Sequence, residues 1–441
     1  MSKRHLKRHR QQGQVLVLST LILVPLFGML GLVTDMGYMH YVKMSAQAAA
    51  EAAAEAAIID FHSTTGGASF TCGGNVVCAS TPTACPTSIT TPANSIEHGC
   101  MYAQANGFNS AGSVTYQTGR SATPPTAPGS GTASYWITFR VTQQVPQLFS
   151  AVLGNTSGLV AARSTVALMG AADCIYALNP NASGAVSVGG TASLTSSCGL
   201  LVDSSDSCAI STNGTATLSA PEYDIVGNAC THNPLTPSPR TGITPASDPL
   251  ASLPVPASAP YTCDYVNYTA SNWSNPTLNP GVYCGGIQVR NNNYTLNPGT
   301  YTLVGGGLTT QNANSNITGS GVMIYNTFDS THSYGPIDIA ATSTVNLSAR
   351  TTGTYAGILF FEDRGAPASS DTYGGGATAV YQGTIYAKNA AITMHGNSSV
   401  SAAYTIIVAD TISLVGTTGL SNNYSSLPGG ASPIQLVAIL E

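Results

Sequence analysis

The sequence predicts an α+β, mostly β fold: an N-terminal transmembrane helix with an Ala-rich extension, a small α+β piece, and a parallel β-helix-like ectodomain. Three observations predict it. Residues 14–34 carry no charge, alanine dominates residues 46–57, and strand-like segments recur about every 20 to 24 residues after residue 170. A β-sandwich is the alternative for the last part, because it also uses many short strands.

Charged residues are scarce and unevenly placed. They make up 7% of the 441 residues, against about 25% in an ordinary soluble protein. Five of the cations fall in the first ten residues, whereas residues 44–441 hold eight cations and 18 acids, a net charge of −10. This part lacks the basic surface that nucleic acids require, so no nucleic-acid partner is predicted.

The start of the chain is predicted to lie in a membrane. Residues 1–13 form a basic tail, and the uncharged stretch 14–34 matches the roughly 20 apolar residues that span a bilayer. The positive-inside rule puts the tail in the cytoplasm and the C-terminal part beyond the inner membrane, in the periplasm or at the cell surface. A cleaved signal peptide is the alternative, but its apolar core has about 7–15 residues and ends in an A-x-A-like site, which this stretch lacks. We therefore expect a retained single-pass anchor.

The helix is predicted to continue past the membrane, so that residues 14–60 form a transmembrane helix and an Ala-rich periplasmic extension. Pro25 would kink this helix rather than end it. Small side chains let two helices approach closely. Ala49, Ala53 and Ala56 are therefore the helix-packing candidates, for a partner protein or for a second copy of this chain. A solvated spacer, stable through the helix propensity of alanine, is the alternative.

The segment GQVLVLSTLILVPLFGMLGLVTDMGYMHYVKMSAQAAAEAAAEAAI resembles the N-terminal segment of the TadE/TadG-like proteins of the tight-adherence (Flp) pilus-assembly system. In that family a Gly-Gln pair opens the apolar span, an Asp-x-Gly follows, and an aromatic and basic patch leads into an Ala-rich helix. The matching positions are Gly13, Gln14, Asp35, Gly37, Tyr41, Lys43 and Ala46–Ala57. Pilin-like members that are processed carry Glu where this chain has Leu18, so processing after Gly13 is not expected.

The resemblance implies a membrane-anchored, non-catalytic component that acts in pilus assembly or surface adhesion. Its partners would be the membrane and other pilus-assembly proteins, and it would need no cofactor. A stand-alone surface adhesin is the alternative. A β-helix enzyme that acts on polysaccharides is a third hypothesis, because parallel β-helices include such enzymes. No catalytic, cofactor-binding or metal-binding residue is assigned.

Residues 61–170 are predicted to be a loop-rich region with a small α+β piece. The first part is rich in Gly, Thr, Ser and Pro, apart from a short helix near residues 95–106. Alternation over residues 135–141 predicts a half-buried strand. Pro146 suits the first turn of a short helix, and a second strand follows at residues 159–168.

Residues 171–441 are predicted to form the β-helix-like repeat domain. CIYAL at 174–178, CGLLV at 198–202 and EYDIV at 222–226 recur at a spacing of 24 residues. Coils of this length stack so that each strand pairs with the next coil, which satisfies the backbone without charged side chains. The Pro-rich stretch 231–260 interrupts the repeat and is predicted to be an excursion from the stack.

All ten cysteines follow the predicted span, which indicates up to five disulfides in an oxidising compartment. Cys174 and Cys198 lie one coil apart, so stacking would bring them to about 4.8 Å from each other. A disulfide needs Cα atoms about 4.4–6.8 Å apart. We therefore predict that this pair is bridged or forms a ladder.

One polar motif resembles a metal site. Asp203, Ser205 and Ser207 fit the D-x-S-x-S pattern of the von Willebrand A domain, which TadG-like proteins often carry, and such oxygen ligands suit Mg²⁺. That domain has a helix next, whereas the residues that follow here are strand-like. The motif is therefore interpreted as a polar turn between coils.

A second motif, FFEDRGAP, is the densest charge cluster beyond the tail. The enzyme hypothesis rests on its Glu362, Asp363 and Arg364, with Asp338 and Asp371 nearby in sequence. Catalysis on a polysaccharide needs several carboxylates that converge on one cleft, and cations are scarce here. We therefore interpret the cluster as a turn that ends the preceding strand.

Overall fold

The computed structural model describes residues 12–65, 70–129, 132–269, 275–290, 293–310, 315–376, 379–396, 402–427 and 430–441. The predicted cytoplasmic tail, residues 1–13, lies outside the described residues except for its last two. The chain divides into two compact units. The first unit consists of Met1–Phe61, Thr71–Leu168 and Val437–Glu441, and the second of His62–Phe70 and Met169–Leu436.

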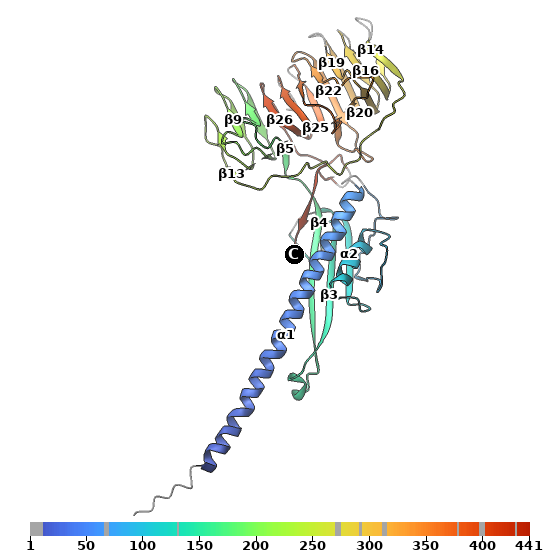
Figure 1. Ribbon diagram of the computed structural model, residues 1–441. Helices are drawn as coiled ribbons and strands as arrows, with labels where there is room; N and C mark the ends of the chain where they lie inside the picture. The colour runs from blue at the N-terminus through green and yellow to red at the C-terminus, as the bar shows by residue number, and fades with distance from the viewer. Residues whose placement is uncertain are drawn as a thin grey trace, which may run out of the picture. The chain divides into compact units, whose positions relative to one another are not determined.

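The first described element is one long helix, α1, which runs from Gln12 to Thr65 and has 54 residues (Figure 1). At about 1.5 Å per residue it is about 80 Å long. Pro25 lies inside α1 and does not end it. The prediction of a long apolar N-terminal helix is therefore confirmed.

The first unit also contains a second helix and an antiparallel sheet. Its elements are α2 (Ser95–Ala105), the 3-10 helix η1 (Ser150–Leu153), β1 (Thr83–Ala84), β2 (Val114–Ala122), β3 (Ala133–Pro146), β4 (Ser157–Gly170) and β28 (Gln435–Ile439). The strands lie in the order β1-β2-β3-β4-β28. β3 pairs with β2 on one side and with β4 on the other, both antiparallel. The last strand of the chain thus completes a sheet that begins with the first strands.

Both helices pack on the same face of this sheet, because alternate residues of β3 point to that face. The ring of Tyr135 stacks on Phe61 of α1 with 4.1 Å between ring centroids. Four residues further along the same face, Phe139 lies against Gly99 of α2. Tyr135, Ile137 and Phe139 are fully buried. The face that the sheet offers to the helices is therefore the core of the first unit.

The region 61–170 differs from the prediction in two respects. Pro146 ends β3 instead of opening a helix, and the turn that follows is η1 at the tip of a β3–β4 hairpin. We expected a strand, a helix and a second strand. The structure has an antiparallel hairpin instead, because β3 and β4 pair directly from Tyr135–Leu168 to Pro146–Ser157. β2 falls in a stretch predicted to be loop, because its small polar residues show no alternation of apolar side chains.

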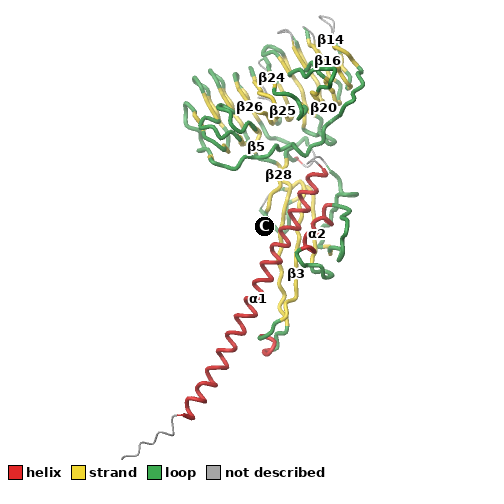
Figure 2. Tube along the Cα trace, viewed as in Figure 1, coloured by secondary structure: helices red, strands yellow, loops and turns green. Residues whose placement is uncertain are grey.

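The second unit consists of many short strands joined by loops (Figure 2). Before the Pro-rich stretch they are β5 (Asp173–Ala177), β6 (Val186–Val188), β7 (Ser193–Ser196), β8 (Gly199–Val202), β9 (Ile210–Thr212), β10 (Thr217–Ser219), β11 (Tyr223–Ile225), β12 (Ala229–Cys230) and β13 (Arg240–Thr241). After it they are β14 (Tyr265–Thr269), β15 (Thr277–Leu278), β16 (Gly281–Val289), β17 (Asn293–Leu296), β18 (Gly299–Val304), β19 (Leu308–Thr310), β20 (Asn316–Thr327), β21 (Ile337–Ile339), β22 (Thr344–Ala349), β23 (Ile358–Glu362), β24 (Ser369–Tyr373), β25 (Val380–Met394), β26 (Thr405–Leu414) and β27 (Thr418–Leu420).

These strands stack in parallel, one repeat upon the next. β5 pairs with β8 and β8 with β11, so that Ile175, Leu200 and Tyr223 occupy equivalent positions. Such stacking agrees with the predicted repeat of CIYAL, CGLLV and EYDIV. The structure confirms a mostly β body of stacked parallel strands. The sheets do not close, and a β-helix is not confirmed.

The order of the strands in space differs from their order in the chain. β5 lies between β8 and β26, in the interior of the stack. The chain proceeds outward from β5 through β8 and β11 to β13, and it reaches β14 at the other end of the stack through residues 242–264. From β14 it returns through β16, β18, β20, β23 and β25 to β26. Figure 1 shows the connection between β13 and β14 running along the stack.

Residues 242–264 belong to the Pro-rich stretch predicted at 231–260. The structure differs from that prediction at the beginning of the stretch, where Arg240 and Thr241 form β13 and pair with β11. From residue 242 on, the segment contains no strand until β14. We call residues 242–264 the strap.

Apolar and aromatic side chains stack inside the second unit. Tyr265, Tyr283 and Tyr301 lie on the neighbouring strands β14, β16 and β18, with ring centroids 4.5 and 5.9 Å apart. Tyr283 and Tyr301 are fully buried. Because each strand finds its backbone partners in the next repeat, the interior needs few charged groups, which explains the scarcity of charge in the sequence.

Candidate functional site

The part of α1 that precedes Asp35 presents large apolar side chains in every direction. Their exposed fractions run from 48% at Leu23 to 70% at Met29. A helix that is apolar around its whole circumference requires apolar surroundings. In the described part of the chain, α1 is the one helix long and apolar enough to cross a membrane, by length and composition.

Asp35 closes the uncharged stretch and is itself only 5% exposed. Its carboxylate accepts hydrogen bonds from the backbone N–H groups of Leu148, Phe149 and Ser150, at 3.1, 3.0 and 2.7 Å. The hydroxyl of Ser150 donates a fourth, at 2.8 Å. Four donors compensate for the burial of the charge. Asp35 therefore holds the tip of the β3–β4 hairpin against α1.

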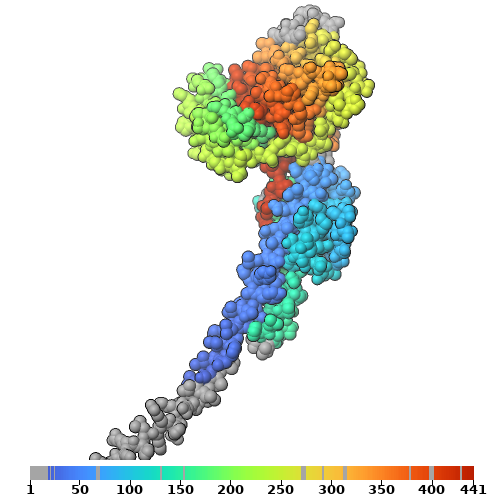
Figure 3. Space-filling view, viewed as in Figure 1, coloured from blue at the N-terminus to red at the C-terminus, as the bar shows by residue number. Residues whose placement is uncertain are grey.

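Two close contacts reinforce this attachment. A Cβ atom at Gly31 would lie 2.5 Å from two atoms of the Phe149 side chain, so only glycine fits there. One turn beyond Asp35, Met39 packs on Gly158 of β4. Figure 3 shows the hairpin, in green, against the blue helix.

The family-motif residues fall into two groups. Asp35 makes the contacts just described, whereas Tyr41 and Lys43 are exposed on α1. Gly37 has open space around it, with nothing within 4 Å of the position of a Cβ atom. Gly13 and Gln14 lie in the first turn of α1, and their surroundings lie outside what the structure describes.

The helix-packing candidates lie on the face of α1 that the first unit covers. Ala49 and Ala53 are fully buried and Ala56 is half-buried. Gly99 of α2 approaches so closely that a Cβ atom there would lie 2.5 Å from the carbonyl oxygen of Ala53. In the structure α2 of the same chain packs against this face at Ala53, and association with a second copy of the chain stays a prediction.

All ten cysteines are paired. Cys174 of β5 is bonded to Cys198 beside β8, with 5.5 Å between their Cα atoms. The other pairs are Cys72–Cys78, Cys85–Cys100, Cys208–Cys230 and Cys263–Cys284. Three of the five bridges join successive repeats of the second unit, with sequence separations of 24, 22 and 21 residues. Besides Cys174–Cys198, the spacing of the repeat could have predicted the bridges Cys208–Cys230 and Cys263–Cys284.

The described residues contain one cluster of side chains spaced for a metal ion. Cys263, Cys284 and His332 have ligand atoms within 4.8 Å of one another. Cys263 and Cys284 are joined by a disulfide, so neither offers a thiolate. The motif of Asp203 and Ser205 is also engaged, because Asp203 accepts the N–H of Ala246 and Ser205 donates to the carbonyl of Pro180.

The acidic cluster contains a pairing that the sequence did not reveal. Glu362 at the end of β23 and Asp371 of β24 are 3% and 1% exposed. Burial raises the pKa of Glu362 well above its usual range, and the neighbouring Asp371 raises it further. Burial also raises the pKa of Asp371. Two carboxyl groups this close and this buried are stable when they share a proton.

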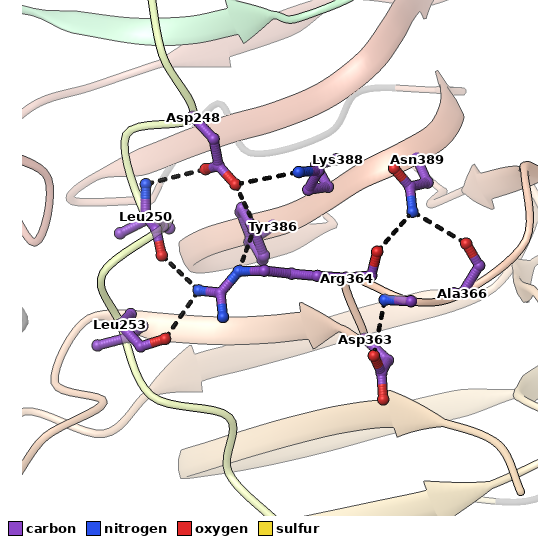
Figure 4. A network of polar contacts seen from close by, with 10 residues as sticks. Asp248, Leu250, Leu253, Asp363, Arg364, Ala366, Tyr386, Lys388 and Asn389 are labelled. Atoms are coloured by element: carbon purple, nitrogen blue, oxygen red, sulfur yellow. Dashed lines mark hydrogen bonds and ion pairs between the residues drawn. The ribbon is translucent and has the colours of Figure 1, made fainter.

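The other members of the cluster make structural contacts, which Figure 4 shows. Arg364 donates from Nε to the hydroxyl of Tyr386 at 2.8 Å and from Nη2 to the carbonyl oxygens of Leu250 and Leu253. The same tyrosine donates to Asp248 at 2.6 Å. β23 ends at Glu362 and a turn follows at residues 363–366, as predicted. Arg364 in this turn also fastens the strap to β25, which the sequence did not predict.

Fold and site together define a class of protein: an apolar helix of membrane-spanning length, attached to a disulfide-bonded, mostly β body. Residues 13–60 match the family model described as putative Flp pilus-assembly TadE/G-like. The resemblance seen in the sequence is confirmed over that segment. Among curated proteins and solved structures, none matches the chain.

Proposed function

We propose that this protein is a membrane-anchored, envelope-exposed component of a tight-adherence (Flp) pilus system, and that it acts in pilus assembly or surface adhesion. One observation carries the proposal: the TadE/G-like segment 13–60 includes the part of α1 before Asp35, where large apolar side chains are exposed. In water such a helix would expose a large apolar surface, which is unfavourable in free energy. A bilayer removes this surface from water.

The proposed location is the inner membrane, with a single pass and the N-terminus in the cytoplasm. The basic residues before the uncharged stretch support this orientation. The five cysteine pairs support export of the rest of the chain, because disulfides persist in oxidising compartments. The body would then lie in the periplasm or at the cell surface.

The proposed body is β-helix-like. Parallel pairing between successive repeats supports it, as do the disulfides between neighbouring repeats. Stacked repeats make an elongated, rigid surface, which suits adhesion or a scaffold for assembly.

The proposed role is non-catalytic. The enzyme hypothesis rested on Glu362, Asp363 and Arg364. Glu362 is buried, Arg364 holds the strap, and Asp363 accepts hydrogen bonds from Tyr325 and Thr327 at 2.9 and 2.7 Å. Side chains engaged in this way support a structural role for the cluster.

Co-purification of the full-length protein from its native envelope tests the proposal, with mass spectrometry of its partners and of its N-terminus. The matched control is a variant in which residues 18–28 are scrambled, which keeps the composition and hydropathy of the span. We expect the parent to be recovered with pilus-assembly proteins and with residues 1–13 attached. The scrambled variant should stay in the membrane but be recovered with fewer pilus-assembly proteins.

Two outcomes would contradict the proposal in different ways. Recovery of the parent without any pilus-assembly protein would favour the stand-alone adhesin. A new N-terminus at Gln14 would show pilin-like processing, and the protein would then be a subunit rather than a retained anchor.

A further inference from the structure

The tip of the β3–β4 hairpin exposes two large apolar side chains. Leu148 is 73% exposed and Phe149 is 49% exposed. Both belong to the turn that Asp35 holds by its hydrogen bonds. Exposing large apolar side chains to water is unfavourable in free energy. Their presence at the end of a hairpin therefore indicates a partner surface.

The position of the tip along α1 indicates what that surface is. Phe149 touches Gly31, which lies inside the uncharged stretch 14–34. Ten residues later, Tyr41 is 68% exposed, and Lys43 follows. Exposed tyrosines with a nearby lysine are typical of the membrane interface. At about 1.5 Å per residue, the contact at Gly31 lies about 15 Å below Tyr41, on the side of the bilayer core.

We propose that the hairpin tip, residues 147–156, enters the leaflet on the side of the β-rich body, with Leu148 and Phe149 against lipid acyl chains. The inference rests on the proposed function, in which α1 spans the membrane. If Gly31 lies in lipid, the side chain that packs on it lies in lipid as well.

Several backbone groups of the tip are hydrogen-bonded within the protein. This lowers the cost of entering a bilayer, where each unsatisfied backbone N–H or C=O group costs several kcal/mol. Asp35 accepts three of the tip's N–H groups. Gln147 donates its N–H to the carbonyl of Thr156 at 3.0 Å, and Asn155 donates to that of Ser150 at 3.1 Å. The donors in turn neutralise the charged oxygens of Asp35, which explains how a carboxylate is stable at the end of an apolar span.

The consequence is a second attachment of the first unit to the bilayer. A single helix leaves the sheet free to rotate about the helix axis at the membrane surface. A hairpin tip inserted beside the helix fixes which face of the first unit points along the membrane. Asp35 then connects the two elements in the membrane, α1 and the hairpin tip, through its hydrogen bonds.

Tryptophan quenching by brominated lipid tests the insertion in the full-length chain. Three variants are reconstituted in phosphatidylcholine vesicles with and without acyl-brominated phosphatidylcholine: Leu148→Trp at the tip, Leu23→Trp in the uncharged stretch, and Ser80→Trp on an exposed loop of the first unit. Quenching is measured as the increment over the parent, which contains two tryptophans. We expect Leu148→Trp and Leu23→Trp each to be quenched at least twofold more than Ser80→Trp.

The outcomes separate the two proposals. Quenching of Leu23→Trp alone overturns the insertion and leaves the anchor standing, with the tip facing water or a protein partner. Quenching of neither residue overturns both. A second pair of changes tests the contact itself in the Leu148→Trp background: Gly31→Leu displaces Phe149 and should reduce quenching by half or more, whereas Gly28→Leu, with nothing within 4 Å, should not.

Discussion

Asp35 shows what a single residue contributes in this fold. The sequence marks it as the first charge after the apolar span and as part of the family motif. The structure adds that its carboxylate binds a turn 113 to 115 residues away. Such a contact depends on where β3 ends, and β3 is longer than the alternation of its first half predicts. The residue was therefore identifiable from the sequence, but its partner was not.

Glu362 carries a prediction about pH. Its pKa is raised above its unfolded value of 4.5, so the folded chain binds the proton more tightly than the unfolded chain. The stability that follows is fully present below pH 4.5 and is lost as the pH rises through the raised pKa. Asp371, Tyr334 and Asn326 surround the carboxyl group.

Glu362→Gln keeps the volume and removes the titration. We expect the melting temperature of the parent to fall between pH 5 and pH 8, and that of the variant to fall less, by about 2 °C or more. Asp173, whose pKa burial raises to about 6, contributes equally to both proteins. Differential scanning fluorimetry at the two pH values measures the difference. An identical decrease in the melting temperature of both proteins would mean that Glu362 and Asp371 do not share a proton in the folded state.

At the scale of elements, α1 was predictable and the hairpin beside it was not. Alanine content and a charge-free stretch whose one proline is Pro25 favour a helix locally. The β3–β4 hairpin depends on Pro146, which local rules place at the start of a helix as readily as at the end of a strand. The sequence points to the alanines of α1 as a packing face for a partner, but it could not show that α2 of the same chain lies against Ala53.

The alanine face gives a prediction with a matched control. Ala53 is fully buried against α2, whereas Ala48 is exposed on the other side of α1. Ala53→Leu adds volume to a filled space and should destabilise the first unit by about 1–3 kcal/mol. Ala48→Leu should change little, because leucine is almost as good a helix former as alanine. Urea unfolding of both variants in detergent measures the effect. Equal stabilities would show that the face is loosely packed and open to a partner helix.

At the scale of the whole chain, the repeat was predictable and its order was not. A spacing of 24 residues predicts which strands stack, and the Cys174–Cys198 bridge follows from it. Nothing in that spacing shows that the chain enters the stack at an interior strand and returns to it after crossing from β13 to β14. That order is set by contacts between β5 and β26, which are more than 200 residues apart.

The strap is the segment that makes this order possible, and Arg364 holds it. Arg364→Gln leaves the carbonyl oxygens of Leu250 and Leu253 without their charged donor, which should cost about 2–3 kcal/mol. Lys388→Gln is the control, because its ion pair with Asp248 is long, at 3.6 Å. Hydrogen exchange of residues 246–256 should accelerate in the first variant and not in the second. Unchanged exchange in both would mean that the strap is held by its prolines alone.

The central claim is that one span near residues 14–34 separates a cytoplasmic tail from all that follows. Trypsin digestion of inverted inner-membrane vesicles tests it most directly, because Lys3, Arg4, Lys7, Arg8 and Arg10 precede the span and the next site is Lys43. The account predicts a chain that loses only its first ten residues, and cleavage at later sites after detergent is added. Cleavage at Arg120 or beyond in sealed vesicles, or protection of the tail, would contradict it.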